Sequence, residues 1–93
     1  MSAAPTPFQA AVIAVLSGLR AGDVMSYGEV AREAGCGSPR AVGQFLAQQG
    51  DEHPWWRVVM ADRKLAPGKE AEQGRRLRAE GVTVVDDRVV PAG

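Results

Sequence analysis

Residues 26–50 read SYGEVAREAGCGSPRAVGQFLAQQG, two segments that each open on serine and close on glycine. In the first segment Glu29 follows Ser26 by three residues, the spacing of a capping box at a helix start. In the second segment a proline stands directly after the serine, which suits the first helical turn. Apolar residues recur at helical spacing in both, so we predict two short helices, ending at Gly35 and at about Gln49. Two such helices joined by a glycine-containing turn indicate a helix-turn-helix.

Further elements are predicted on both sides of this unit. Thr6 and Pro7 predict an earlier helix start, and the apolar residues after them keep helical spacing to Leu19. The other predicted elements are an extended segment at 24–25, a strand at 58–59, a turn at 61–64, a helix at 69–80 and a hairpin around 86–87. We therefore predict one domain over residues 1–93, mostly α with short β strands. It is a winged-helix-like α+β fold that contains a helix-turn-helix, with 1–6 and 91–93 as loose ends.

The charge and composition limit the possible functions. The formal net charge is zero, from 11 basic and 11 acidic residues, which argues against a protein that coats nucleic acid by bulk attraction. A local basic face is still compatible with this charge, because residues 35–50 contain no acid and have Arg40 among them. We expect no transmembrane helix and no signal peptide. The single cysteine, Cys36, excludes an internal disulfide and fits a reducing cytoplasm.

One face of the predicted helix over 38–49 consists mainly of small residues. Opposite its apolar stripe lie Arg40, Ala41, Gly43, Gln44, Ala47 and Gln48. Small side chains read base edges poorly, but they let a helix backbone press into a narrow groove, with the arginine as the long reach. The alternative is that this face packs against another part of the protein.

Two aromatic features are ambiguous when taken alone. Tyr27, at a helix start, can present its hydroxyl to a phosphate, although a lone tyrosine is more often half-buried structure. Residues 54–57 read PWWR, and adjacent side chains of an extended segment point to opposite sides. One indole would then enter the core while the other lines a pocket. The alternative is that both indoles are core residues.

Taken in order, four motifs resemble the DNA-binding domain of the O6-alkylguanine-DNA alkyltransferases. They are YGEVA at 27–31, SPRAVGQ at 38–44, PWWRVV at 54–59 and RLRAEGV at 76–82. The third motif of that family reads Pro-Cys-His-Arg-Val, and its cysteine accepts the alkyl group. A tryptophan at the cysteine position is typical of the alkyltransferase-like proteins, which bind the lesion without repairing it. The resemblance covers roughly residues 8–85, and we expect no separate amino-terminal domain of the kind common in full alkyltransferases.

The resemblance implies roles for individual residues. Tyr27 would press on a phosphate and help rotate the damaged nucleotide, and Arg40 would fill the vacated base stack. The expected DNA contacts are Tyr27, Ser38, Arg40, Ala41, Gly43 and Gln44. The expected lesion pocket is formed by Pro54, Trp55, Trp56, Arg57, Val58, Gly68 and Lys69. Main-chain carbonyls around Trp55 and Val58 would face the guanine amino group.

The catalytic relay of the family is incomplete in this sequence. Trp55 stands at the position of the acceptor cysteine and Trp56 at that of the relay histidine. Glu80 matches the relay glutamate and has nothing to activate, because a thiolate needs a basic neighbour to attack carbon at neutral pH. Cys36 lies in the turn of the helix-turn-helix, where we expect it to be a small structural hydrophobe. We therefore expect no enzymatic activity, no cofactor and no metal.

The resemblance implies a non-enzymatic protein that binds duplex DNA in the minor groove and flips O6-alkylguanine into a pocket. The complex would flag the lesion for nucleotide excision repair. The expected partners are double-stranded DNA containing alkylated guanine and nucleotide excision repair proteins, with no membrane partner. We expect a cytoplasmic monomer that is associated with the nucleoid when bound to DNA. Two alternatives are a winged-helix transcription regulator that reads the major groove and a residual alkyltransferase that uses Cys36.

Overall fold

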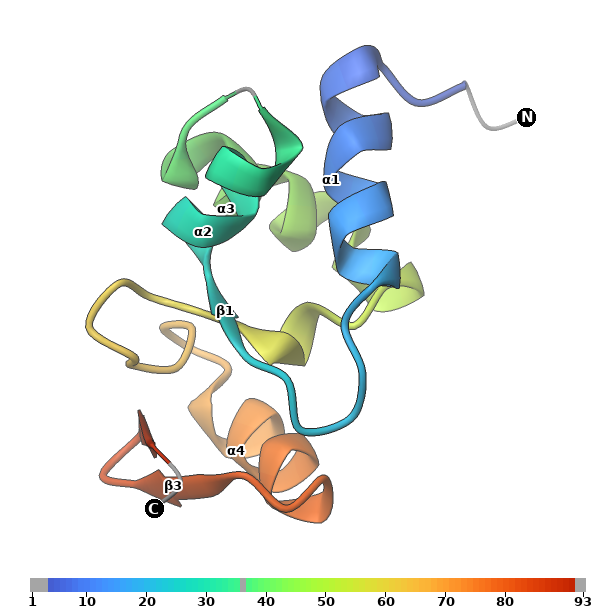
Figure 1. The fold of residues 1–93 in the computed structure, drawn as a ribbon. Helices are drawn as coiled ribbons and strands as arrows, with labels where there is room; N and C mark the ends of the chain where they lie inside the picture. The colour runs from blue at the N-terminus through green and yellow to red at the C-terminus, as the bar shows by residue number, and fades with distance from the viewer. Residues whose placement is uncertain (1–3, 36, 92–93) are drawn as a thin grey trace.

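The helix-turn-helix and the helix before it form one end of the molecule, and a helix with a hairpin forms the other (Figure 1). The computed structural model describes residues 4–35 and 37–91. Its elements are α1 Pro7–Ser17, β1 Met25–Ser26, α2 Tyr27–Ala34, α3 Pro39–Gln49, the 3₁₀ helices η1 Gly50–Glu52 and η2 Trp55–Arg57, β2 Val58–Val59, α4 Glu70–Ala79, β3 Thr83–Val85 and β4 Arg88–Val90. The predicted class, a mostly helical winged-helix-like α+β fold with a helix-turn-helix, is confirmed.

Local side chains set the starts of the first three helices. Thr6 Oγ1 accepts a hydrogen bond from the backbone N–H of Gln9, whose side-chain oxygen accepts one from Thr6 N–H, both at 3.1 Å. Ser26 and Glu29 form the predicted capping box of α2, and Ser38 caps α3. Thr6 is therefore a fixed cap rather than part of a loose end. Of the other residues predicted as loose ends, 1–3 and 92–93 lie outside the described residues.

The turn between α2 and α3 rests on α1. Gly35 ends α2 with a left-handed φ of 74°, and Gly37 has a φ of 81°. A Cβ atom at Gly37 would lie 2.4 Å from the ring of Phe8, so both the backbone conformation and the close approach require glycine there. Cys36 lies outside the described residues, so the structural role expected for it stays a prediction.

Two small cores stabilise the two ends of the fold. The first is formed by Val12, Leu16, Val30, Ala31, Val42, Phe45, Leu46, Trp55 and Val58. The second is formed by Val59, Leu65, Leu77, Val84 and Val89. Trp56 packs against both cores, and β1 pairs in parallel with β2 between them, with Met25 opposite Val58. The segment from Trp55 to Val59 therefore contributes to both cores and connects the two ends of the fold.

The predicted hairpin is present as β3 and β4, which pair antiparallel with Thr83 opposite Val90. Its two-residue turn places Asp86 and Asp87 at φ values of 52° and 58°, as a type I′ turn requires. Lys64 pairs with β4 on the other side. None of the helices within 4–35 and 37–91 combines the length and the apolar character needed to cross a membrane.

Three elements differ from the sequence prediction: α1 ends at Ser17 instead of Leu19, η1 follows α3, and the segment after Pro54 is not extended. Residues 55–57 form the 3₁₀ helix η2 instead of an extended segment, and Val58 N–H donates to the carbonyl of Trp55. The two indoles meet edge to face, with ring centroids 6.4 Å apart and planes at 90°. The reason is a tertiary contact, because the side chains of Trp56 and Arg57 are bonded to Glu80, which follows α4.

Candidate nucleic-acid interface

A cavity of about 250 Å³ lies between α3 and the loop that precedes α4. We call it the Trp55 cavity. Its wall is formed by Tyr27, Gly43, Leu46, Ala47, Gln48, Gly50, Asp51, Trp55, Ala66, Pro67 and Lys69. Four of these residues, Tyr27, Gly43, Trp55 and Lys69, are predicted site residues from four different segments. The fold brings them to one concave surface.

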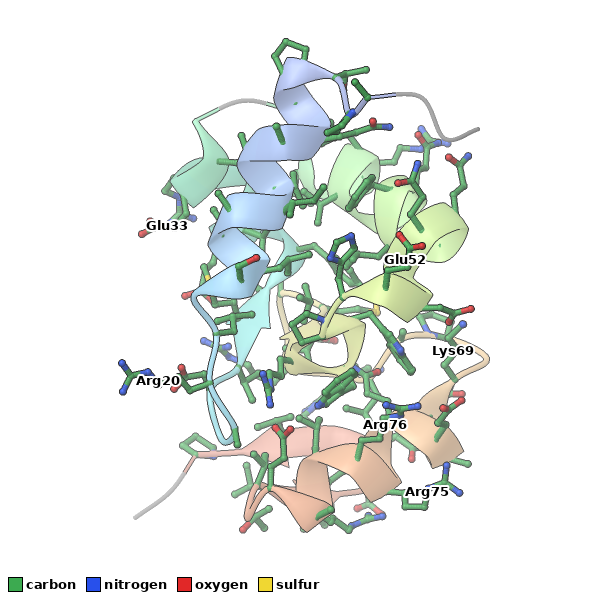
Figure 2. The ribbon with its side chains drawn as sticks, turned by 90° about the vertical axis from the view of Figure 1, so that its right-hand side faces the viewer. Arg20, Glu33, Glu52, Lys69, Arg75 and Arg76 are labelled. Carbon is green, nitrogen blue, oxygen red and sulfur yellow. The ribbon has the colours of Figure 1, made fainter. Side chains whose placement is uncertain are left out.

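Trp55 belongs both to the core and to the cavity wall. Its side chain packs in the first core, and the residue is 8% exposed. The indole lies close over η1, since a Cβ atom at Gly50 would be 3.3 Å from the Cβ of Trp55. Two cations also lie near the ring of Trp55. Lys69 Nζ is 5.1 Å and the Arg76 guanidinium carbon 5.9 Å from its centroid. Figure 2 shows Lys69 near the right-hand edge of the view and Arg76, on α4, nearer its centre. Trp55 is therefore a core residue and a pocket residue at the same time.

The exposed face of α3 is open beside the cavity. Arg40 and Gln44 are exposed, and Ala41 and Gly43 are half-buried. A Cβ atom at Gly43 would meet no other atom within 4 Å among the described residues. At Gly43, therefore, this small face does not pack against another part of the chain that the structure describes. Ser38 serves this helix as its N-cap.

Tyr27 stands at the first residue of α2 and reaches the same cavity. Burial raises the pKa of its hydroxyl above the ordinary value of 10.0. The phenol is therefore neutral at physiological pH and can donate a hydrogen bond to an anionic oxygen.

Glu80, just after α4, ties together segments from both ends of the molecule. Its carboxylate accepts hydrogen bonds from Trp56 Nε1 at 3.0 Å, from Arg57 Nε at 3.0 Å and Nη2 at 2.6 Å, and from the backbone N–H of Gly22 at 3.2 Å. Arg57 also donates to the carbonyl of Leu19 at 3.0 Å. The hydrogen bonds from Arg57, with smaller help from Trp56 and Gly22, lower the pKa of Glu80 from 4.5 to about 2. Glu80 is thus a fixed anion that clamps η2 to α4 and to the loop after α1.

Only Trp55 and Lys69, of the seven residues predicted for the lesion pocket, line the Trp55 cavity. The other five are not among its lining residues: Pro54, Trp56, Arg57, Val58 and Gly68. Trp56 turns aside because its indole is bonded to the clamp described above. Val58 is completely buried, and its carbonyl accepts a hydrogen bond from Gln73 Nε2 at 2.8 Å. One acceptor site of this carbonyl is therefore already used inside the protein, and its contact with a guanine amino group stays a prediction.

Several wall residues carry no local signal in the sequence. Gly50 and Asp51 lie in η1 and Ala66 and Pro67 in the loop before α4, and only the tertiary structure brings them beside Trp55. Gln73 is equally absent from the expected site, although it lies completely inside the protein. Its position four residues before Leu77 is the one pattern that could have indicated a buried helix face. No group of three His, Cys, Asp or Glu side chains able to hold a metal occurs within residues 4–35 and 37–91.

Residues 7–82 match the family described as 6-O-methylguanine DNA methyltransferase, DNA binding domain. The chain belongs to this family. A curated relative from Vibrio parahaemolyticus serotype O3:K6 (strain AQ3810), named DNA base-flipping protein, is 35% identical over 82 residues. That match covers 83% of this chain and 82% of the relative.

Two solved structures resemble the fold over most of its length. S. pombe Atl1 in complex with damaged DNA containing O6-carboxymethylguanine has a TM-score of 0.76 and 29% identity, covering 84% of this chain and 79% of that one. S. pombe ATL in complex with DNA has a TM-score of 0.62 and 27% identity, covering 88% and 84%. Within the family the chain is therefore alkyltransferase-like.

Proposed function

We propose that this protein recognises O6-alkylated guanine in duplex DNA by receiving the flipped base in the Trp55 cavity, and that it transfers no alkyl group. The observation that carries the proposal is a large aromatic side chain, Trp55, forming the wall of a cavity beside the open face of α3. The similarity to a protein named for base flipping and to Atl1 bound to O6-carboxymethylguanine DNA supports it.

The open face of α3 suits a close approach to the minor groove. Space is free beside Gly43, so a sugar-phosphate edge can come near the helix backbone without a clash. Arg40 is exposed at the start of the same helix and supplies the long side chain that would enter the base stack. Tyr27, with its neutral hydroxyl, would contact a phosphate next to the rotated nucleotide.

The free energy that base flipping costs is offset in large part by new stacking contacts. Flipping a base costs a few kcal/mol, and less when alkylation has already weakened the pair. Stacking the base on an aromatic side chain returns about 1–3 kcal/mol, and Arg40 in the vacated stack returns part of the rest. Damaged guanine is therefore favoured over normal guanine, because its extrusion costs less and its alkyl group gains apolar contact with the indole.

The composition of the cavity wall supports the proposal that no alkyl group is transferred. Its wall, within the described residues, contains neither a thiol nor an imidazole. The indole N–H of Trp56 can only donate a hydrogen bond, so it cannot take a proton as a relay histidine would. Glu80 is ionised and bonded to Arg57, Trp56 and Gly22, which leaves it a structural anion. A complex that no reaction ends would persist on the DNA.

A persistent complex on flipped and distorted DNA is a suitable flag for nucleotide excision repair, and we propose this as the consequence of binding. The experiment that tests recognition is a pair of titrations with duplexes that differ only in one base, guanine or O6-methylguanine. We expect tighter binding to the methylated duplex. Equal affinities would favour the alternative of a winged-helix regulator that reads sequence in the major groove.

A further inference from the structure

Gln73 is a completely buried amide in a helix that is otherwise charged or exposed along most of its surface. Its Oε1 accepts a hydrogen bond from the backbone N–H of Ala66 at 2.7 Å. Its Nε2 donates to the carbonyls of Trp56 at 3.0 Å and Val58 at 2.8 Å. Burying an amide is costly unless its polar atoms are bonded, so the side chain fits this place only with all three bonds made.

These three bonds tie together two segments that contribute to the wall of the Trp55 cavity. Ala66 belongs to the loop wall, together with Pro67 and Lys69. Trp56 is the next residue after Trp55, whose ring lies 5.1 Å from Lys69 Nζ of the loop wall. One side chain from α4 therefore ties the loop wall to the segment that contains Trp55, without itself lining the cavity.

We infer that Gln73 is a positioning residue for base capture, which sets the width of the slot between the loop wall and the indole of Trp55. This inference rests on the function proposed above. A base stacks well only where the opposing surfaces stand at the right separation, so a shift of the loop wall weakens the hold on a flipped base. Contacts of the duplex with α3 do not pass through Gln73 and are unaffected by such a shift.

The chemistry of the side chain makes the inference selective. Donation to two carbonyls and acceptance from one N–H need an amide, which has both a donor and an acceptor end. Glutamate has the same length but would set a carboxylate against the carbonyl oxygens of Trp56 and Val58. Methionine has a similar length and makes none of the three bonds. Both substitutions loosen the tie between the walls while they keep the volume nearly constant.

The test compares wild type, Gln73→Glu and Gln73→Met by titration with paired guanine and O6-methylguanine duplexes. The control is Gln49→Glu, the same change at an exposed residue at the end of α3. Circular dichroism melting fixes a temperature at which each variant is folded. We expect the two Gln73 variants to lose about tenfold in affinity for the methylated duplex, a loss in the range of one base–aromatic stack, and less than about twofold for the plain duplex.

Three results would overturn the inference in distinguishable ways. A wild type without preference for the methylated duplex removes the proposed function and this inference with it. A wild type with the preference and folded Gln73 variants that keep it shows Gln73 to be purely structural. Equal weakening toward both duplexes shows a general loss of DNA binding instead of a change in the slot. If Gln73→Glu does not fold, Gln73→Met decides by the same ratio of affinities.

Discussion

The guanidinium of Arg57 donates two hydrogen bonds to the carboxylate of Glu80, at 3.0 and 2.6 Å, with both side chains about 15% exposed or less. The other hydrogen bonds to this carboxylate come from Trp56 Nε1 and the backbone N–H of Gly22. Glu80 is therefore a clamp between the two cores. This relationship leads to the first prediction.

Glu80→Gln is expected to lower the free energy of unfolding by about 2 kcal/mol at neutral pH, because charged hydrogen bonds to Arg57 are lost. The pKa of Glu80 is lowered in the fold, so its contribution is complete above pH 4.5 and is lost as the pH falls toward about 2. Urea unfolding at neutral pH and at about pH 3 checks this, with the difference between wild type and variant shrinking at the lower pH.

The matched control for Glu80 is Glu72→Gln, on the same helix. Glu72 pairs with Arg76 at 3.0 Å, but both side chains are more than 40% exposed. Its loss should change stability by less than about 0.5 kcal/mol. If both variants were equally stable, the clamp would have no special role.

Arg40→Ala is expected to weaken binding to an O6-methylguanine duplex by about tenfold or more, because the vacated base stack is left unfilled. Its effect on unfolding should stay within about 0.5 kcal/mol, since the side chain is exposed. Arg20→Ala removes the same charge from an exposed residue outside α3 and is the control. Identical losses for the two variants would mean that only net charge matters.

Gly43→Leu is expected to abolish close approach to DNA without harming the fold. No atom lies within 4 Å of a Cβ at this position, and glycine within a helix costs about 1 kcal/mol relative to alanine. Melting should therefore show equal or higher stability, while affinity for both plain and methylated duplex falls. A stable Leu variant that binds like wild type would place the DNA on another face.

The intact mass of the protein is expected to stay constant during long incubation with excess O6-methylguanine duplex. The cavity wall has no thiol among the described residues, and the single cysteine, Cys36, stands between α2 and α3 in the sequence. Mass spectrometry resolves the addition of one methyl group. Methylation of Cys36 would restore the alternative of a residual alkyltransferase.

The helix starts and the hairpin are predictable from the sequence because their signals are local. Thr6, Ser26 and Ser38 bond to N–H groups three residues away, and the Asp86–Asp87 turn lies between two strands that pair with each other. The conformation of such segments depends mainly on neighbouring residues, so it can be predicted without the rest of the chain.

The candidate site is predictable only in part, for the opposite reason. The path of residues 55–57 depends on Glu80, more than twenty residues away, so an extended reading of PWWR fails. The carbonyl of Val58 is bonded to Gln73, which no local pattern pairs with it. Trp55 could be predicted as important, but its double place in core and cavity follows from packing that spans several elements.

That double place decides how Trp55 should be tested. Removing a core tryptophan costs about 3–5 kcal/mol, enough to unfold a domain of this size, so Trp55→Ala would mix folding with recognition. The emission of Trp55 reports on the same contact while the side chain stays in place. Trp56 is the only other tryptophan, and Trp56→Phe leaves Trp55 as the sole indole emitter.

The most direct measurement is therefore a fluorescence titration of the Trp56→Phe protein with plain and O6-methylguanine duplexes at concentrations that saturate both. If a flipped base enters the Trp55 cavity, stacking changes the emission of Trp55 strongly with the methylated duplex and far less with the plain one. The change should reach its end point at one duplex per protein. An emission that responds equally to both duplexes, or to neither while binding is complete, would contradict base capture against Trp55.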